Sequence, residues 1–121
     1  MKLDHINVRA SAAELVVVKR FYEAILGLVD GARPPFASKG HWLYSGSQPL
    51  VHLSESRSPP GSKPNGLDHV AFRVDFIAPI LRRLEENGVP YERFHIEELG
   101  LTQLFVRDPV GNRLEINARE T

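Results

Sequence analysis

Two histidines occupy equivalent places in two copies of one short segment of this 121-residue chain. The first copy, Leu3–Ala10, reads LDHINVRA, and the second, Leu67–Val74, reads LDHVAFRV. Each copy places a histidine third (His5 and His69) and an arginine four residues later, within an apolar and β-branched run. Similarity at a fixed offset indicates an internal structural repeat. One histidine from each half is also what a site with pseudo-twofold symmetry would contain.

The repeat extends to a second pair of residues that can bind metals. At an offset of about 64 residues, the closing hairpin over 43–54 matches the one over 104–117, which brings His52 within a residue of the position of Glu115. Three imidazoles and one carboxylate suit Zn²⁺, Ni²⁺, Co²⁺, Fe²⁺ or Mn²⁺ and do not suit Ca²⁺. Two histidines and one carboxylate also leave coordination positions for a substrate, as catalytic metal sites require. All four side chains point away from the apolar face of their own predicted strand; the set is His5, His52, His69 and Glu115.

Each of these residues also has an ordinary explanation. A single histidine on a strand is usually a hydrogen-bonded, half-exposed residue, and a glutamate on a terminal strand is usually solvated. The residues alone leave both explanations open, and the repeat favours the metal site because one symmetry operation relates all four positions. His41 and His95 have no symmetric partner, so we expect them at the surface.

Arg9 and Arg73 are a further symmetric pair, on the same strand face as the histidines. They are candidates to bind an anionic group of a substrate, with solvated strand edges as the alternative. Trp42, Tyr44 and Phe105 are candidates to line a substrate cavity, although aromatic residues in strands also serve as core.

Composition limits the classes of function. Fifteen basic and fifteen acidic residues give a net charge of zero, so no general basic field favours nucleic acid or an anionic membrane. The chain has no cysteine, which excludes disulfides, thiolate metal sites and a cysteine nucleophile. We see no signal peptide, and no apolar run approaches the roughly 20 residues of a membrane span. We therefore expect a soluble, cytoplasmic protein.

The elements that position these residues form the same series in each half. In the first half, alternation predicts a strand over 2–9, and the capping box of Ser11 and Glu14 starts a helix that ends at Gly27. A short strand near 28–30 and a hairpin of strands over 41–45 and 50–54 follow. The segment 57–65, rich in Ser, Pro and Gly, is predicted to link the halves.

The second half repeats this order. A strand over 67–74 precedes a helix that we predict to be capped by Asp75 and to run to Gly88, with Pro79 in its first turn. Strands over 91–97, 103–107 and 113–117 follow, the last two joined by a tight turn over 108–112. The chain is thus predicted to be a single domain of two βαβββ modules, 1–56 and 66–121.

The sequence resembles the vicinal oxygen chelate superfamily, which includes glyoxalase I, extradiol dioxygenases, methylmalonyl-CoA epimerase and bleomycin-resistance proteins. The matching stretches are the two Asp-His strands, the segment from Phe21 to Leu28, and the run Phe105–Ile116, which reads FVRDPVGNRLEI. The resemblance implies an α+β fold in which two βαβββ modules form a curved, cup-shaped mixed sheet with the helices outside. It also implies a divalent metal ion bound at the positions of His5, His52, His69 and Glu115, a substrate that chelates this metal through adjacent oxygens, and a homodimer.

Some positions depart from the pattern of individual members. Glyoxalase I-like proteins carry a glutamate at the position of His52, and that residue shares in proton abstraction. They also have an asparagine where this chain has Ser56 and an arginine where it has Asn65, whereas Arg9 matches. Members with three protein ligands use the positions of His5, His69 and Glu115, which are intact here.

The sequence therefore predicts a divalent-metal-dependent enzyme with lyase or isomerase, dioxygenase or thiol-transferase chemistry. His5, His69 and Glu115 are the expected core ligands, and His52 is expected to be a fourth ligand or the general base. Catalytic roles are expected for His52 and Glu115, and substrate contacts for Arg9, Arg73, Tyr44 and Phe105. A metal-free, ligand-sequestering protein of the bleomycin-resistance type is the alternative, and a module of a larger assembly with vestigial ligands is a third reading.

Overall fold

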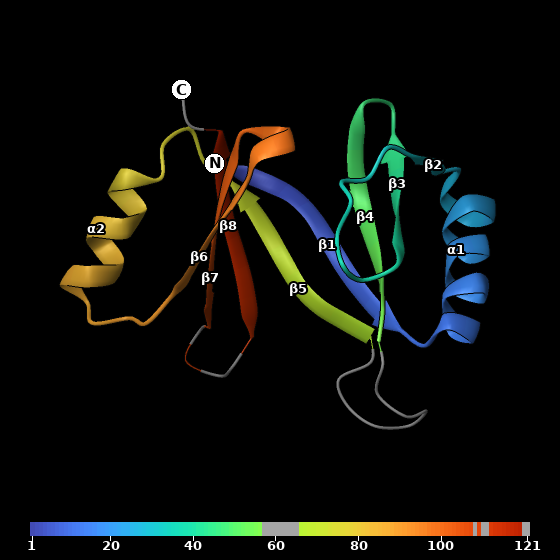
Figure 1. Cartoon of the computed structure of the whole chain (residues 1–121), viewed down its shortest axis with the longest axis horizontal. Helices are drawn as coiled ribbons and strands as arrows, with labels where there is room; N and C mark the ends of the chain where they lie inside the picture. Colours follow the sequence, from blue (N-terminus) through green and yellow to red (C-terminus); the bar gives the residue numbers. More distant parts are fainter. Residues whose placement is uncertain (57–65, 108, 110–111, 120–121) are drawn as a thin grey trace. The chain divides into compact units, whose positions relative to one another are not determined.

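The computed structural model describes residues 1–56, 66–107, 109 and 112–119. The chain divides into two compact units: a first unit, Asp4–Asp68, and a second unit composed of Met1–Leu3 and His69–Thr121. Each unit contains one α-helix and a mixed four-stranded sheet, in the order strand, helix, three strands (Figure 1). The α+β fold of two βαβββ modules is thus confirmed. The module boundaries and the cup shape stay predictions.

The first unit is built from β1 (Lys2–Ala10), α1 (Ala12–Leu26), β2 (Val29–Gly31), β3 (Gly40–Ser45) and β4 (Gln48–Glu55). Its sheet has the order β2-β3-β4-β1, with β1 parallel to β4 and the other neighbours antiparallel. The predicted capping box is present: the amide of Glu14 donates to the Ser11 hydroxyl, and the amide of Ser11 donates to the Glu14 carboxylate. Gly27 ends the helix in the left-handed conformation, at φ +67°. Both local signals are confirmed.

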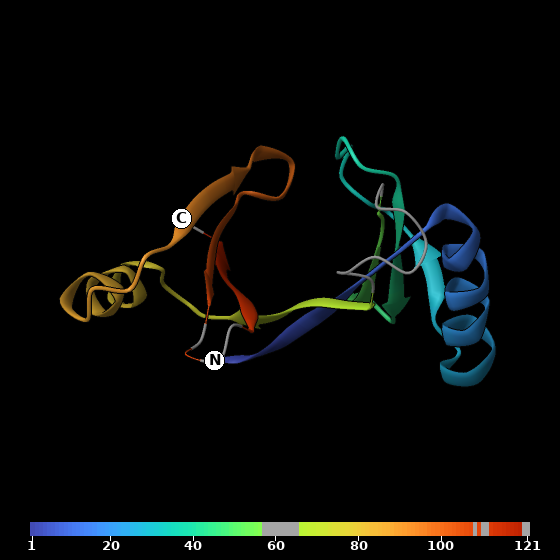
Figure 2. The same cartoon turned by 90° about the horizontal axis from the view of Figure 1, so that it is seen from below.

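The second unit is built from β5 (Gly66–Arg73), α2 (Ala78–Glu86), β6 (Glu92–Ile96), a 3₁₀ turn (Glu97–Leu99), β7 (Leu101–Arg107) and β8 (Arg113–Arg119). Its sheet has the order β5-β8-β7-β6, with β5 parallel to β8. Within each unit the helix packs on one face of the sheet (Figure 2).

Apolar side chains from the helix and the sheet form a core in each unit. In the first unit Leu15 of α1 packs with Leu43 and Leu53, and in the second unit Ile77 packs with Leu104 and its neighbours. The alternating residues of these strands therefore point to the opposite face of the sheet. That face carries the candidate ligands.

One helix boundary was predicted incorrectly. Asp75 does not cap α2; the N-cap is Ile77, which makes no side-chain capping bond, and Pro79 follows in the first turn. Pro79 lacks an amide hydrogen and has a helical φ, so the helix can begin without a side-chain acceptor. The predicted linker 57–65 and positions 108, 110 and 111 of the predicted turn lie outside the described residues.

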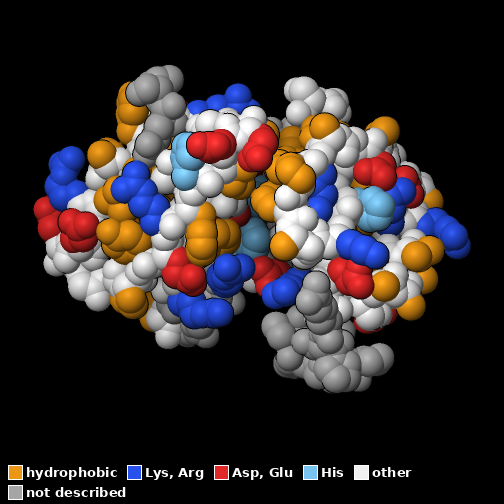
Figure 3. Space-filling view, in the orientation of Figure 1, with side chains coloured by type: hydrophobic (Ala, Val, Ile, Leu, Met, Phe, Trp, Pro, Cys, Tyr) orange, Lys and Arg blue, Asp and Glu red, His pale blue; other side chains and the backbone are white. Residues whose placement is uncertain are grey.

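The surface is mixed in character. Basic and acidic side chains are interspersed over the visible face of each unit (Figure 3), in keeping with the zero net charge. No helix in the described part of the chain combines the length and apolarity that crossing a membrane requires.

Candidate metal centre

The strand registers place the candidate ligands at equivalent positions in the two units. In the first unit Asn7 pairs with His52, which pairs in turn with Trp42. In the second unit Ala71, at the position equivalent to Asn7, pairs with Glu115, which pairs with Phe105. His5 and His69 each lie two residues before the paired residue of their strand, on the same face of the sheet. The predicted equivalence of His52 and Glu115 is therefore confirmed by the hydrogen-bonded register.

In the second unit His69 and Glu115 form a buried pair. The His69 Nε2 atom lies 3.2 Å from Glu115 Oε1. The two residues are only 7% and 1% exposed. A carboxylate so far from water requires a charged or donating partner, and the same two atoms have the character of ligands for a divalent metal.

Asn117 fixes the orientation of the Glu115 carboxylate. Its Nδ2 atom donates a hydrogen bond of 2.6 Å to Glu115 Oε2, and its Oδ1 atom accepts from the Arg73 Nε atom. Asn117 is fully buried. One carboxylate oxygen is thus held by the protein while the other lies beside His69, which is how proteins orient carboxylates that bind metals.

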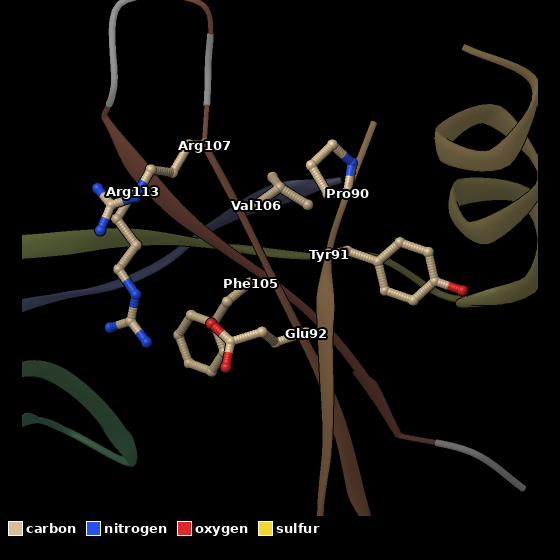
Figure 4. Close-up of a pocket in the computed structure, with 7 residues that line it drawn as sticks. All are labelled: Pro90, Tyr91, Glu92, Phe105, Val106, Arg107 and Arg113. Atoms are coloured by element: carbon tan, nitrogen blue, oxygen red, sulfur yellow. The ribbon is translucent and has the colours of Figure 1, made fainter. Parts of the chain in front are cut away.

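Phe105 links this pair to a cavity in the second unit. Its ring meets the His69 ring edge to face at 5.5 Å, and the Arg113 guanidinium lies 4.1 Å from the ring centre. Phe105 and Arg113 also line a cavity of about 280 Å³ (Figure 4). Its remaining lining residues are Pro90, Tyr91, Glu92, Val106 and Arg107.

In the first unit Asp4 fixes the tautomer of His5. The His5 Nδ1 atom lies 2.7 Å from Asp4 Oδ2, and both residues are 6% exposed. Because a carboxylate accepts, Nδ1 carries the hydrogen and the ring's lone pair resides on Nε2. A carboxylate behind a histidine is the usual support of a histidine that binds a metal. Gln48 Nε2 donates to the main-chain oxygen of Asp4 at 2.9 Å and holds this aspartate in place.

His52 lies within a stack of three aromatic rings. Its imidazole is parallel to the His5 ring, with 3.6 Å between ring centres and 14° between planes. On its other face lies Trp42, at 4.0 Å and 13°. The His52 Nε2 atom lies 3.1 Å from the Pro49 carbonyl oxygen, which can only accept, so Nε2 carries the hydrogen.

The residues predicted to contact substrate have different surroundings. Phe105 lies against His69 as described. Arg9 pairs with Asp68 at 3.6 Å, and Arg73 donates to Asn117. The Tyr44 hydroxyl donates to the Ala32 carbonyl. Direct contact of these four residues with a substrate stays a prediction.

The two histidines without a symmetric partner are both at least partly exposed to solvent. His95 is exposed, as expected. His41 is half-buried on β3, and its Nδ1 atom lies 3.1 Å from Asp30 Oδ2.

Three supporting residues were missed by the sequence reasoning. Asp4 precedes its histidine in the repeated Asp-His pair, which was a visible signal. Asn117 shares the face of Glu115, but its bond to that carboxylate depends on rotamers that no pattern encodes. Trp42 was considered only as cavity or core, whereas it stacks on His52.

Comparisons with known proteins agree on the family. The sequence model of the Glyoxalase/Bleomycin resistance protein/Dioxygenase superfamily matches residues 2–116. The chain is 30% identical over 121 residues to Glyoxylase I 4 of Arabidopsis thaliana, covering 94% of this chain and 68% of the relative.

Solved structures show the same fold. Methylmalonyl-CoA epimerase from Mycobacterium tuberculosis superposes with a TM-score of 0.73 at 16% identity, covering 99% of this chain and 89% of the epimerase. A 2,3-dioxygenase from a Pseudomonas species superposes with a TM-score of 0.72 at 21% identity, covering 99% of this chain and 41% of the dioxygenase. At these identities the similarity shows the fold alone.

Proposed function

Because the chain belongs to the Glyoxalase/Bleomycin resistance protein/Dioxygenase superfamily, we propose that it is a divalent-metal-dependent enzyme acting on a small substrate through vicinal oxygens. The reaction is of the lyase or isomerase, dioxygenase or thiol-transferase type. The 30% identical relative named as a glyoxylase and the family description, which includes dioxygenases, support this range of chemistry.

His5, His69 and Glu115 are the proposed ligands. The observation that carries the proposal is that both units bury a pair of ligand-type side chains at the same register, His5 with His52 and His69 with Glu115. Two imidazole nitrogens and one carboxylate oxygen fit Zn²⁺, Ni²⁺, Co²⁺, Fe²⁺ or Mn²⁺.

The residues behind these ligands fit the same role. Asp4 places the lone pair of His5 on Nε2, and Asn117 holds one oxygen of Glu115. When bound, such a metal polarises the adjacent oxygens of a substrate and lowers the cost of developing negative charge. For a lyase or isomerase reaction, Glu115 is also the group proposed to exchange a proton with the substrate; its Oε1 atom faces His69, whereas Asn117 holds Oε2.

The cavity beside Phe105 is the proposed place for the rest of the substrate. Its volume of about 280 Å³ suits a small molecule. Arg113 above the Phe105 ring favours an anionic or polar group there, and Phe105 connects the cavity to His69. Arg9, Arg73 and Tyr44 remain proposed contacts on the basis of the sequence. We also propose that the protein is a homodimer, which light scattering after gel filtration will test.

Turnover in the presence and absence of metal tests the proposed function. The metal-loaded protein is assayed with 2-oxoaldehyde and thiol mixtures, with catechols and with 2-acyl thioesters, and each assay is repeated after chelation and with His69→Ala. We expect metal-dependent turnover of one class and its loss in the variant. Thermal stabilisation by such compounds that persists in chelator, without turnover, would instead identify a metal-free binding protein.

A further inference from the structure

His52 occupies the position at which the sequence leaves two roles open, fourth ligand or general base. Its surroundings in the first unit point to a third role, the positioning of a neighbouring ring. Both faces of the ring are covered, by His5 at 3.6 Å and by Trp42 at 4.0 Å. The residue is 7% exposed.

A hydrogen bond to the backbone also holds the His52 ring in place. Nε2, the atom through which an imidazole most often binds a metal or exchanges a proton, donates to the Pro49 carbonyl at 3.1 Å. Pro49 lies three residues earlier on the same strand, β4, so this bond ties the ring to its own backbone. Coordination through Nε2 would require the loss of both this hydrogen bond and the tautomer that it selects.

The ring stack also restricts the orientation of the His5 side chain. The Asp4 carboxylate fixes one edge of the His5 ring, and the parallel His52 ring covers one of its faces. Together the two contacts define both the direction of the Nε2 lone pair and the plane in which it lies. Trp42, a large aromatic ring that is 8% exposed, holds His52 from behind.

We infer that His52 is a positioning residue, whose ring, clamped between Trp42 and His5, orients His5 for metal binding without coordinating the metal itself. The inference rests on the proposed function insofar as His5 is a ligand. It predicts that metal affinity depends on a flat ring at position 52 and not on coordination of the metal by the nitrogens of that ring.

Two variants distinguish the effect of the ring's shape at position 52 from the effect of metal coordination by its nitrogens. His52→Phe keeps a flat ring of similar size between His5 and Trp42 but offers no nitrogen, whereas His52→Ala leaves a gap. Zn²⁺ affinity, measured by competition with a chromophoric chelator, should stay near the wild-type value in His52→Phe. It should fall about 10-fold or more in His52→Ala, as for the loss of an outer-shell partner of a ligand.

Circular dichroism and thermal unfolding establish that each variant is folded. The protein contains one tryptophan, Trp42, so its fluorescence reports the ring stack directly. We expect the emission of His52→Ala to differ from that of wild type because Trp42 loses the ring that covers it.

Long-range ¹H–¹⁵N spectra of the histidine rings supply a test that needs no variant. In the metal-free protein His52 should show the Nε2–H tautomer and His5 the Nδ1–H tautomer. Addition of Zn²⁺ should shift the Nε2 resonances of His5 and His69 and leave those of His52 in place.

Three results would overturn the inference: movement of the His52 nitrogens on Zn²⁺ binding, equal losses of affinity in His52→Phe and His52→Ala, or a His52→Phe protein that binds Zn²⁺ normally but no longer turns over substrate. The first two would identify a fourth ligand and the third a base. Failure of the proposed function is distinguishable, because wild-type protein would then bind no Zn²⁺ while the tautomer of His52 would still be readable.

Discussion

Replacement of Asn117 by alanine should weaken metal binding without touching a ligand. Asn117 is fully buried and bonds Glu115 Oε2 at 2.6 Å on one side and Arg73 on the other. A hydrogen bond to a charged group contributes about 1.5 to 3 kcal/mol. Loss of an outer-shell partner lowers metal affinity about 10- to 100-fold, which corresponds to about 1.4 to 2.8 kcal/mol. The two ranges agree, so we expect Asn117→Ala to weaken the free energy of metal binding by an amount within them.

Ser54→Ala is the matched control for this variant. Ser54 occupies the equivalent register on β4, where it pairs with Arg9 as Asn117 pairs with Arg73, but its hydroxyl donates to Asn7 rather than to a candidate ligand. Isothermal titration should show that Asn117→Ala binds Zn²⁺ more weakly than wild type does and that Ser54→Ala binds it with nearly the wild-type affinity. Equal affinities for both variants and wild type would refute the idea that Asn117 orients a metal ligand.

Three further predictions concern stability, each measured by urea unfolding. Removing the metal by chelation should lower the free energy of unfolding by about 2.7 kcal/mol relative to protein at a free metal concentration about 100 times the dissociation constant; an unchanged midpoint would argue against metal binding to the folded state. Gly27→Ala should cost about 1 kcal/mol because this residue ends α1 at φ +67°, which disfavours a Cβ; a neutral or stabilising effect would contradict the assigned cap. Leu104→Ala should cost about 2 to 5 kcal/mol because Leu104 is fully buried in the second core, and a loss below about 1 kcal/mol would contradict that packing.

Much of the site could be predicted from the sequence because it depends on strand periodicity and on the repeat. Alternation alone puts His5 and Ile6 on opposite faces of β1, and the repeat offset aligns His52 with Glu115 before any register is known. Local signals such as the Ser11 capping box and Gly27 also predict the ends of α1 correctly, because their partners lie within a few residues.

Features that depend on rotamers or on contacts between strands could not be predicted. The bond from Asn117 to Glu115 and the stacking of Trp42 on His52 require a particular side-chain direction, which alternation leaves undefined. The incorrect cap at Asp75 has a related cause. An N-cap signal is read from residue type, whereas Pro79 sets the start of α2 through its own backbone.

Metal stoichiometry tests the central claim most directly. The purified wild-type protein is stripped with chelator, reconstituted separately with Zn²⁺, Ni²⁺, Co²⁺, Fe²⁺ and Mn²⁺, freed of excess metal and analysed by mass spectrometry, in parallel with His69→Ala and Glu115→Ala. The proposed site predicts one metal ion per chain in the wild type for at least one of these metals, with strong depletion in both variants. Wild-type protein that retains no stoichiometric metal under any of these conditions would contradict it.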